Sequence, residues 1–149
     1  MWQLLKEIAF KILGLGGELP SPKVRVSEGD LIYLETTKTV EVRNILPKVT
    51  FFTVADTHSM EPLIDKGFIQ IGSSNPEYIN NVVIGDIIVW QKYVQWKGVI
   101  QLKRIMHKIV EIGDDGEWLC RTKGINCLRR DPWKIRRKDI QLVWRGEIV

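Results

Sequence analysis

The chain has 149 residues, a net charge of +4 and a pI near 9.1, and 44% of its residues are hydrophobic. This length suits one domain that buries about 68–70% of its unfolded surface, so stability requires neither a disulfide nor a metal. Cys120 and Cys127 lack C-x-x-C spacing, which argues against a disulfide framework or a zinc ribbon. A zinc site that combines them with His58 and His107 is conceivable but has no motif spacing, so we expect no metal and no cofactor.

The first predicted element is an amphipathic helix within residues 1–17. Gln3, Glu7 and Lys11 share one face, and apolar residues spread over the other. About 14 helical residues cannot cross a bilayer, which needs roughly 20, and no signal-peptide cleavage pattern follows. The segment 2–15 either packs on the domain core or lies in a membrane interface, so the sequence predicts a peripheral membrane protein or a soluble one.

From residue 23 onward the pattern predicts a single β-rich domain that reaches residue 149. Short runs rich in Val, Ile, Phe and Trp alternate with Gly, Asn and Asp, as is typical of strands and turns. The predicted strand regions are 24–45, 48–56, 68–73, 82–91, 99–112, 117–124 and 139–149. The fold class is therefore mostly β with one N-terminal helix.

The positive charge is concentrated in residues 121–138, which hold eight lysines and arginines against one aspartate. A solvated basic face explains such a stretch more simply than a nucleic-acid site does, although Trp133 among the basic residues would suit base stacking. We do not expect nucleic acid as a partner. The stretch would also suit an anionic membrane surface.

The stretch "DTHSMEPLIDKG", residues 56–67, contains the candidate nucleophile Ser59. Nucleophilic catalysis by serine needs a histidine to take the hydroxyl proton and a carboxylate to orient that histidine. These residue types occur in most proteins, so the types alone predict nothing. Their sequence context is what points to a catalytic role.

Five motifs supply this context: "SMEP" at 59–62, "GDIIVW" at 85–90, "HKIVEI" at 107–112, "TKGIN" at 122–126 and "DPW" at 131–133. In order and spacing they resemble the type I signal peptidase family, most closely its archaeal and microsomal Ser-His-Asp branch, over about residues 49–149. The resemblance implies the β-barrel-type fold that signal peptidases share with LexA-like self-cleaving repressor proteases. It also implies a serine endopeptidase that cleaves extended peptides or preproteins after small residues near a membrane.

The resemblance assigns roles to individual residues. Ser59 falls on the nucleophile, His107 on the general base and Asp131 on the orienting carboxylate. The further positions are Thr57 as a contributor to the oxyanion hole, and Met60 and Pro62 as substrate-binding residues beside the nucleophile.

Lys103 is a rival general base, because "LKRI" at 102–105 resembles the bacterial Ser-Lys branch. A lysine base must be desolvated to lose its proton near neutral pH, whereas a histidine titrates there without help. The distance from "HKIVEI" to "TKGIN" also favours His107. Both bases stay open at this point.

The sequence departs from the family pattern at three places. Ile125 stands where the family usually has the Asp of "GDN", so Asp131 must serve alone; His58 replaces a common Gly, and Phe68 replaces an Asp. An inactive peptidase-like module that binds a membrane, a partner protein or nucleic acid is therefore an alternative. Self-cleavage is disfavoured, because the chain has no Ala-Gly or Cys-Gly dipeptide.

Overall fold

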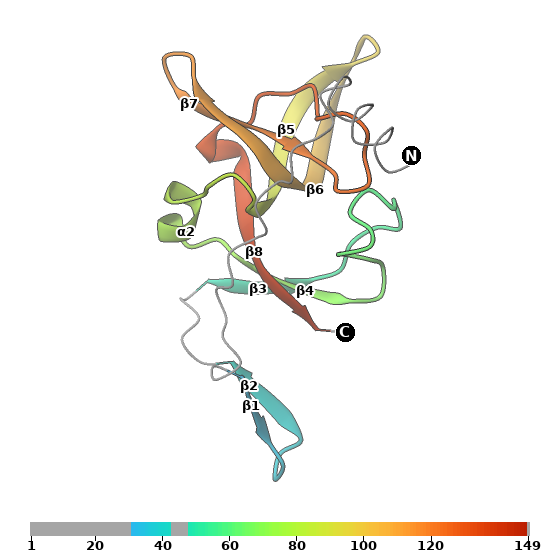
Figure 1. Ribbon diagram of the computed structural model, residues 1–149, viewed down its shortest axis with the longest axis vertical. Coiled ribbons are helices and arrows are strands. Elements are labelled where there is room, and N and C mark those ends of the chain that lie inside the picture. Colours follow the sequence, from blue (N-terminus) through green and yellow to red (C-terminus); the bar gives the residue numbers. More distant parts are fainter. Residues whose placement is uncertain (1–30, 43–47, 149) are drawn as a thin grey trace, which may run out of the picture.

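The computed structural model describes residues 31–42 and 48–148, and the helix predicted within residues 1–17 lies outside them. The strands are β1 (Leu31–Leu34), β2 (Thr39–Val42), β3 (Val49–Phe52), β4 (Ile69–Ser73), β5 (Ile87–Trp96), β6 (Val99–Asp114), β7 (Trp118–Lys123) and β8 (Ile140–Ile148). Helix α2 (Pro76–Asn80) and the 3-10 turn η2 (Arg137–Asp139) connect them. The mostly-β prediction is confirmed (Figure 1).

Six strands form one antiparallel sheet in the order β3-β4-β8-β5-β6-β7. Strands β1 and β2 pair only with each other and form a separate hairpin, which extends away from the main sheet in Figure 1. The described strands thus form two sheets, of which only the larger one builds the site described below.

The predicted barrel closure is wrong for the described strands, because β3 and β7 are the two edges of the sheet and do not pair. After Phe52 the chain leaves the sheet as a loop of turns instead of continuing as a strand towards β6. A cavity lies between this loop and β6, lined by Phe52–Ala55 on one side and by Arg104–His107 on the other. The open side of the sheet is therefore where the site forms.

The first four residues of strand β5, 87–90, are buried on both faces, so alternate side chains enter different cores. Ile88 and Trp90 belong to the first cluster, and Ile87 belongs to the second. The first cluster also contains Val82, Ile109, Cys120, Ile135, Ile140 and Val143, and the second contains Met60 and Ile64. The continuous apolar run of β5 follows from this burial on two sides.

Strand β6 is longer than the strands beside it. Its residues 99–108 pair with β5 through a hairpin whose turn uses the left-handed residues Lys97 (φ 49°) and Gly98 (φ 78°). On its other edge β7 pairs only with residues 108–114. No described strand covers that edge between residues 99 and 106, so part of its backbone is open to a further strand.

The basic stretch 121–138 is largely engaged in contacts within the domain. Arg130 pairs with Glu111, and Lys134 and Arg136 both bind Asp115, at 2.7 Å each. Arg137 donates to two carbonyls and lies over the ring of Trp118. Three of the eight basic side chains are therefore paired with acids, and membrane contact through the stretch stays a prediction.

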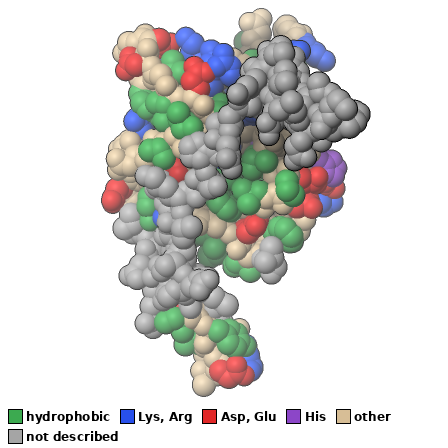
Figure 2. All heavy atoms as spheres, viewed as in Figure 1, with side chains coloured by type: hydrophobic (Ala, Val, Ile, Leu, Met, Phe, Trp, Pro, Cys, Tyr) green, Lys and Arg blue, Asp and Glu red, His purple; other side chains and the backbone are tan. Residues whose placement is uncertain are grey.

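Among the described residues, no helix has the length and apolar character needed to span a membrane. On the face shown in Figure 2, hydrophobic side chains gather over the middle of the main body, with acidic side chains and histidine beside them.

Candidate active site

Ser59 lies in a loop of turns between β3 and β4. The amides of Leu63 and Ile64 both donate to the carbonyl of Met60, at 3.1 Å. The side chains of Met60 and Ile64 are buried in the second core cluster and fix this loop to the sheet. The packing of this loop therefore fixes Ser59 at a partly exposed position.

Ser59, His107 and Asp131 come together although 48 and 24 positions separate them along the chain. Oγ of Ser59 lies 3.1 Å from Nε2 of His107, and Nδ1 of His107 lies 2.7 Å from Oδ2 of Asp131. The carboxylate accepts from Nδ1–H, so Nε2 is left to accept from the hydroxyl. This is the order of contacts that a serine nucleophile requires.

Two buried residues orient Asp131, and the sequence assigned no role to either of them. The indole Nε1 of Trp90 donates to Oγ1 of Thr122 at 3.0 Å, and this hydroxyl donates to Oδ2 of Asp131 at 2.5 Å. Because an indole N–H can only donate, the Thr122 proton must point towards Asp131. Both residues lie inside motifs already noted, "GDIIVW" and "TKGIN". Their place in these motifs was the sequence feature that could have pointed to a role in the site.

Asp131 does not use its carboxylate to pair with its arginine neighbours. Arg130 binds Glu111 instead, and the Asp131 backbone amide donates to the carbonyl of Thr122 at 2.7 Å. With its side chain only 13% exposed, Asp131 is committed to His107 and Thr122. The Asp131 carboxylate therefore contacts the imidazole and not the neighbouring arginines.

The side-chain hydroxyl of Thr57 lies beside that of Ser59, with the two oxygens 3.3 Å apart. It is exposed and lines the cavity, so it is placed to donate to an oxygen bound beside Ser59. Its contribution to an oxyanion hole stays a prediction. Met60 also lines the cavity, whereas the exposed Pro62 is not among the lining residues.

The loop after β7 holds the nucleophile segment in place. The Asn126 amide donates to the Ser59 carbonyl at 2.9 Å, and its Nδ2 donates to the His58 carbonyl at 3.0 Å. A methyl group added to Gly124 would lie 2.5 Å from the Ser59 carbonyl oxygen and 3.0 Å from Nε2 of His107. Only glycine therefore fits between the nucleophile segment and the imidazole.

Ile125, which stands in place of the family's acid, packs against the second core cluster. An acid there would face apolar side chains, so this position contributes packing and Asp131 supplies the carboxylate.

His58 is exposed and lines the cavity, but its ring contacts two carboxylates and not Ser59 or His107. Its Nδ1 lies 2.5 Å from Glu61 and its Nε2 lies 3.4 Å from Asp56. The hydrogen bond and the charge of Glu61 raise the pKa of His58 above its usual value. Asp56, His58 and Glu61 place possible metal-ligand atoms within 4.8 Å of one another. Both ring nitrogens of His58 already contact these carboxylates, so we assign no metal ion to the group.

The residues of the conceivable zinc site do not assemble into a group of possible ligands among the described residues. Cys120 is fully buried in the first core cluster, whereas Cys127 is partly exposed and borders the space beside Gly124. The two cysteines thus have different surroundings and different expected reactivities.

A thiol reagent at about pH 8 should modify Cys127 and leave Cys120 intact in the folded chain. Burial raises the pKa of Cys120 to about 12, so almost none of it is the reactive thiolate. The number of thiols titrated by an aromatic disulfide, with and without denaturant, measures this. Cys127→Ala should abolish native-state labelling, and persistent labelling of that variant would contradict the assignment.

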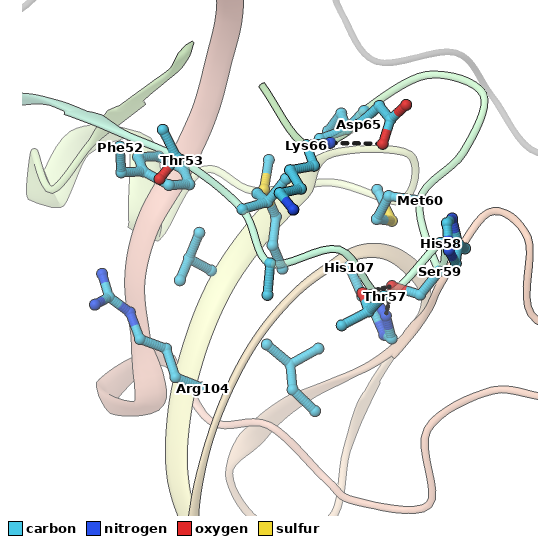
Figure 3. A pocket seen from close by; sticks show the side chains of 16 residues that line it. Phe52, Thr53, Thr57, His58, Ser59, Met60, Asp65, Lys66, Arg104 and His107 are labelled. Carbon is cyan, nitrogen blue, oxygen red and sulfur yellow. Dashed lines mark hydrogen bonds between the residues drawn. The ribbon is translucent and has the colours of Figure 1, made fainter. Parts of the chain in front are cut away.

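The cavity beside Ser59 has a volume of about 400 Å³. Figure 3 shows Ser59, Thr57 and His107 at one end, with Phe52, Thr53 and Arg104 across the cavity from them. Val54, Met60, Ile64, Val89, Ile105 and Met106 give it a largely apolar wall. A reacting group bound at Ser59 would therefore have space for neighbouring atoms along β6.

Comparison of the chain with protein-family models, with curated proteins and with solved structures finds no match in any of the three.

Proposed function

We propose that this protein is a serine endopeptidase that cleaves extended peptides, with Ser59 as nucleophile, His107 as general base and Asp131 as the carboxylate that orients it. The observation that carries the proposal is the continuous chain of hydrogen bonds from Ser59 to Asp131 at the end of an apolar cavity. A structural role alone explains a buried His–Asp pair, but not a partly exposed serine hydroxyl aimed at it.

In this mechanism Ser59 Oγ attacks the scissile carbonyl while Nε2 of His107 takes the hydroxyl proton. Asp131 stabilises the imidazolium that forms, and His107 then donates the proton to the leaving amine. The Ser59 amide and the Thr57 hydroxyl would stabilise the negative oxygen of the tetrahedral intermediate. Water then hydrolyses the acyl-enzyme by the same steps.

An extended peptide suits the cavity because two backbone segments border it. Residues 52–55 lie on one side, and the edge of β6 that β7 leaves unpaired lies on the other. A substrate strand between them would satisfy its own amide and carbonyl groups on both sides. This arrangement favours a peptide over a small ester or amide as the natural substrate.

The motif resemblance supports a finer proposal, a signal-peptidase-like enzyme that cuts after small side chains near a membrane. In the described strands the open side of the sheet contains the site, as an incomplete barrel would allow. The basic stretch 121–138 and the amphipathic pattern of residues 2–15 would favour a membrane surface as the place of action.

The test combines a fluorophosphonate probe, which phosphonylates activated serines with loss of fluoride, with peptides that contain Ala-x-Ala sites, in the presence and absence of anionic vesicles. The native chain should be labelled at Ser59 and cleave the peptides, whereas Ser59→Ala should do neither. Ser74→Ala is the matched control, because Ser74 is not among the residues that line the cavity. Equal labelling of the native chain and Ser59→Ala would refute the proposal.

A further inference from the structure

Arg104 lies in a row of side chains on one face of the β5–β6 hairpin. The row begins in the cavity and extends towards the hairpin turn. In the strand register Met106 lies opposite Val89, Arg104 opposite Gln91, and Leu102 opposite Tyr93. Paired residues of antiparallel strands share a face, so these residues form one row. Val89, Met106 and Arg104 line the cavity, and Tyr93 and Leu102 continue the row onto an exposed apolar surface.

Arg104 has no acidic neighbour in this row. The residue opposite it is Gln91, and the neighbours on its face along β6 are Leu102 and Met106. Most other arginines in residues 31–42 and 48–148 bind an acid or a carbonyl, as Arg121, Arg130, Arg136 and Arg137 do. Arg104 forms no such contact with any described residue. Among the described arginines, it is the one that lines the cavity.

The other charged groups of the cavity do not supply the missing partner. The Asp65 carboxylate accepts from the Lys66 amide at 2.6 Å, and Lys66 Nζ lies 3.7 Å from Asp56. Neither acid forms an ion pair with Arg104 among the described contacts. The cavity therefore presents a guanidinium with five donors at the end opposite Ser59.

We propose that Arg104 forms a subsite for an acidic side chain of the peptide, about three or four residues from the scissile bond, counting about 3.3 Å per strand residue from His107. The proposal rests on the proposed function, because it takes Ser59 as the point of cleavage. A peptide strand along the open edge of β6 would place a side chain against Arg104, and a carboxylate can accept two of its hydrogen bonds. The substrate is then an extended peptide with a small residue at the cut and an acid about three or four residues away from it.

The experiment compares peptides that differ only in carrying Glu, Ala or Lys at each of the five or so positions on either side of the cut. At low salt the native chain should cleave the best-placed Glu peptide about tenfold faster than its Lys counterpart, in kcat/KM. Arg104→Glu should reverse this preference at the same position, and added salt should reduce it. Arg129→Glu is the matched control, since it makes the same charge change at an exposed arginine that is not among the cavity residues, and it should keep the native preference.

Binding of the same peptides to Ser59→Ala, measured by fluorescence anisotropy, separates this proposal from the catalytic one. Preferential binding of the Glu peptide that is lost in Ser59→Ala/Arg104→Glu supports the subsite even if the native chain cleaves none of the peptides. Equal binding of the Glu and Lys peptides, or a Glu preference that survives Arg104→Glu, overturns it.

Discussion

Replacing His107 with alanine is expected to lower kcat for peptide cleavage by about 10⁴–10⁶-fold, whereas Lys103→Ala should change kcat by no more than about twofold. Nε2 of His107 is the ring nitrogen within hydrogen-bond distance of Ser59 Oγ, at 3.1 Å. Without it the hydroxyl has no base to take its proton and must attack as a neutral alcohol. The loss should appear in kcat rather than in KM, since the imidazole acts in the transition state.

The position of Lys103 explains the asymmetry. It shares a face of β6 with His107, but four strand residues correspond to about 13 Å, too far for both side chains to take the same proton. In the register it lies opposite Lys92, and it is not among the residues that line the cavity. The structure thus brings His107, and not Lys103, to Ser59.

Steady-state kinetics on one peptide, with thermal unfolding of each variant to verify its fold, provide the measurement. Added imidazole should partly restore cleavage by His107→Ala, because the space left by the side chain adjoins Ser59. A variant set in which Lys103→Ala is inactive and His107→Ala retains most of its activity would assign this chain to the Ser-Lys mechanism instead.

The strands were predictable because their pattern is local. Alternation and β-branched residues marked most of the observed strands, including the run 99–112 that became most of β6. The short helix Pro76–Asn80 was missed, although Asn75 caps it by accepting from the Glu77 amide. Five residues carry too little periodicity to indicate a helix.

The side-chain contacts of the site could not be predicted from the sequence pattern, because they depend on which strands pair in the fold. Motif order suggested Ser59, His107 and Asp131, but only the fold shows that Asp131 reaches His107 and not its arginine neighbours. Trp90 and Thr122 belong to the site because the strand order places β5 and β7 on either side of β6. The unpaired edge of β6 that exposes Arg104 likewise follows from where β7 ends, which the sequence does not specify.

The charge of Asp131 gives the second large expected effect: Asp131→Asn should lower kcat by about 10³–10⁴-fold, with a much smaller change in KM. Asparagine keeps the shape and can still accept from Thr122 and from Nδ1 of His107 through its oxygen. It removes the negative charge that stabilises the imidazolium when His107 takes the Ser59 proton. It also allows the amide to turn its NH₂ group towards the ring, which favours the tautomer that cannot accept from Ser59.

Asp115→Asn is the matched control, because Asp115 makes its ion pairs with Lys134 and Arg136 and is not among the cavity residues. It should leave kcat within about twofold of native, even if the loss of these solvent-screened ion pairs lowers stability slightly. Unfolding midpoints of both variants separate folding defects from catalytic ones. If Asp131→Asn kept the native kcat, the carboxylate would hold the loop after β7 in place through Thr122, and His107 would act on Ser59 without electrostatic support.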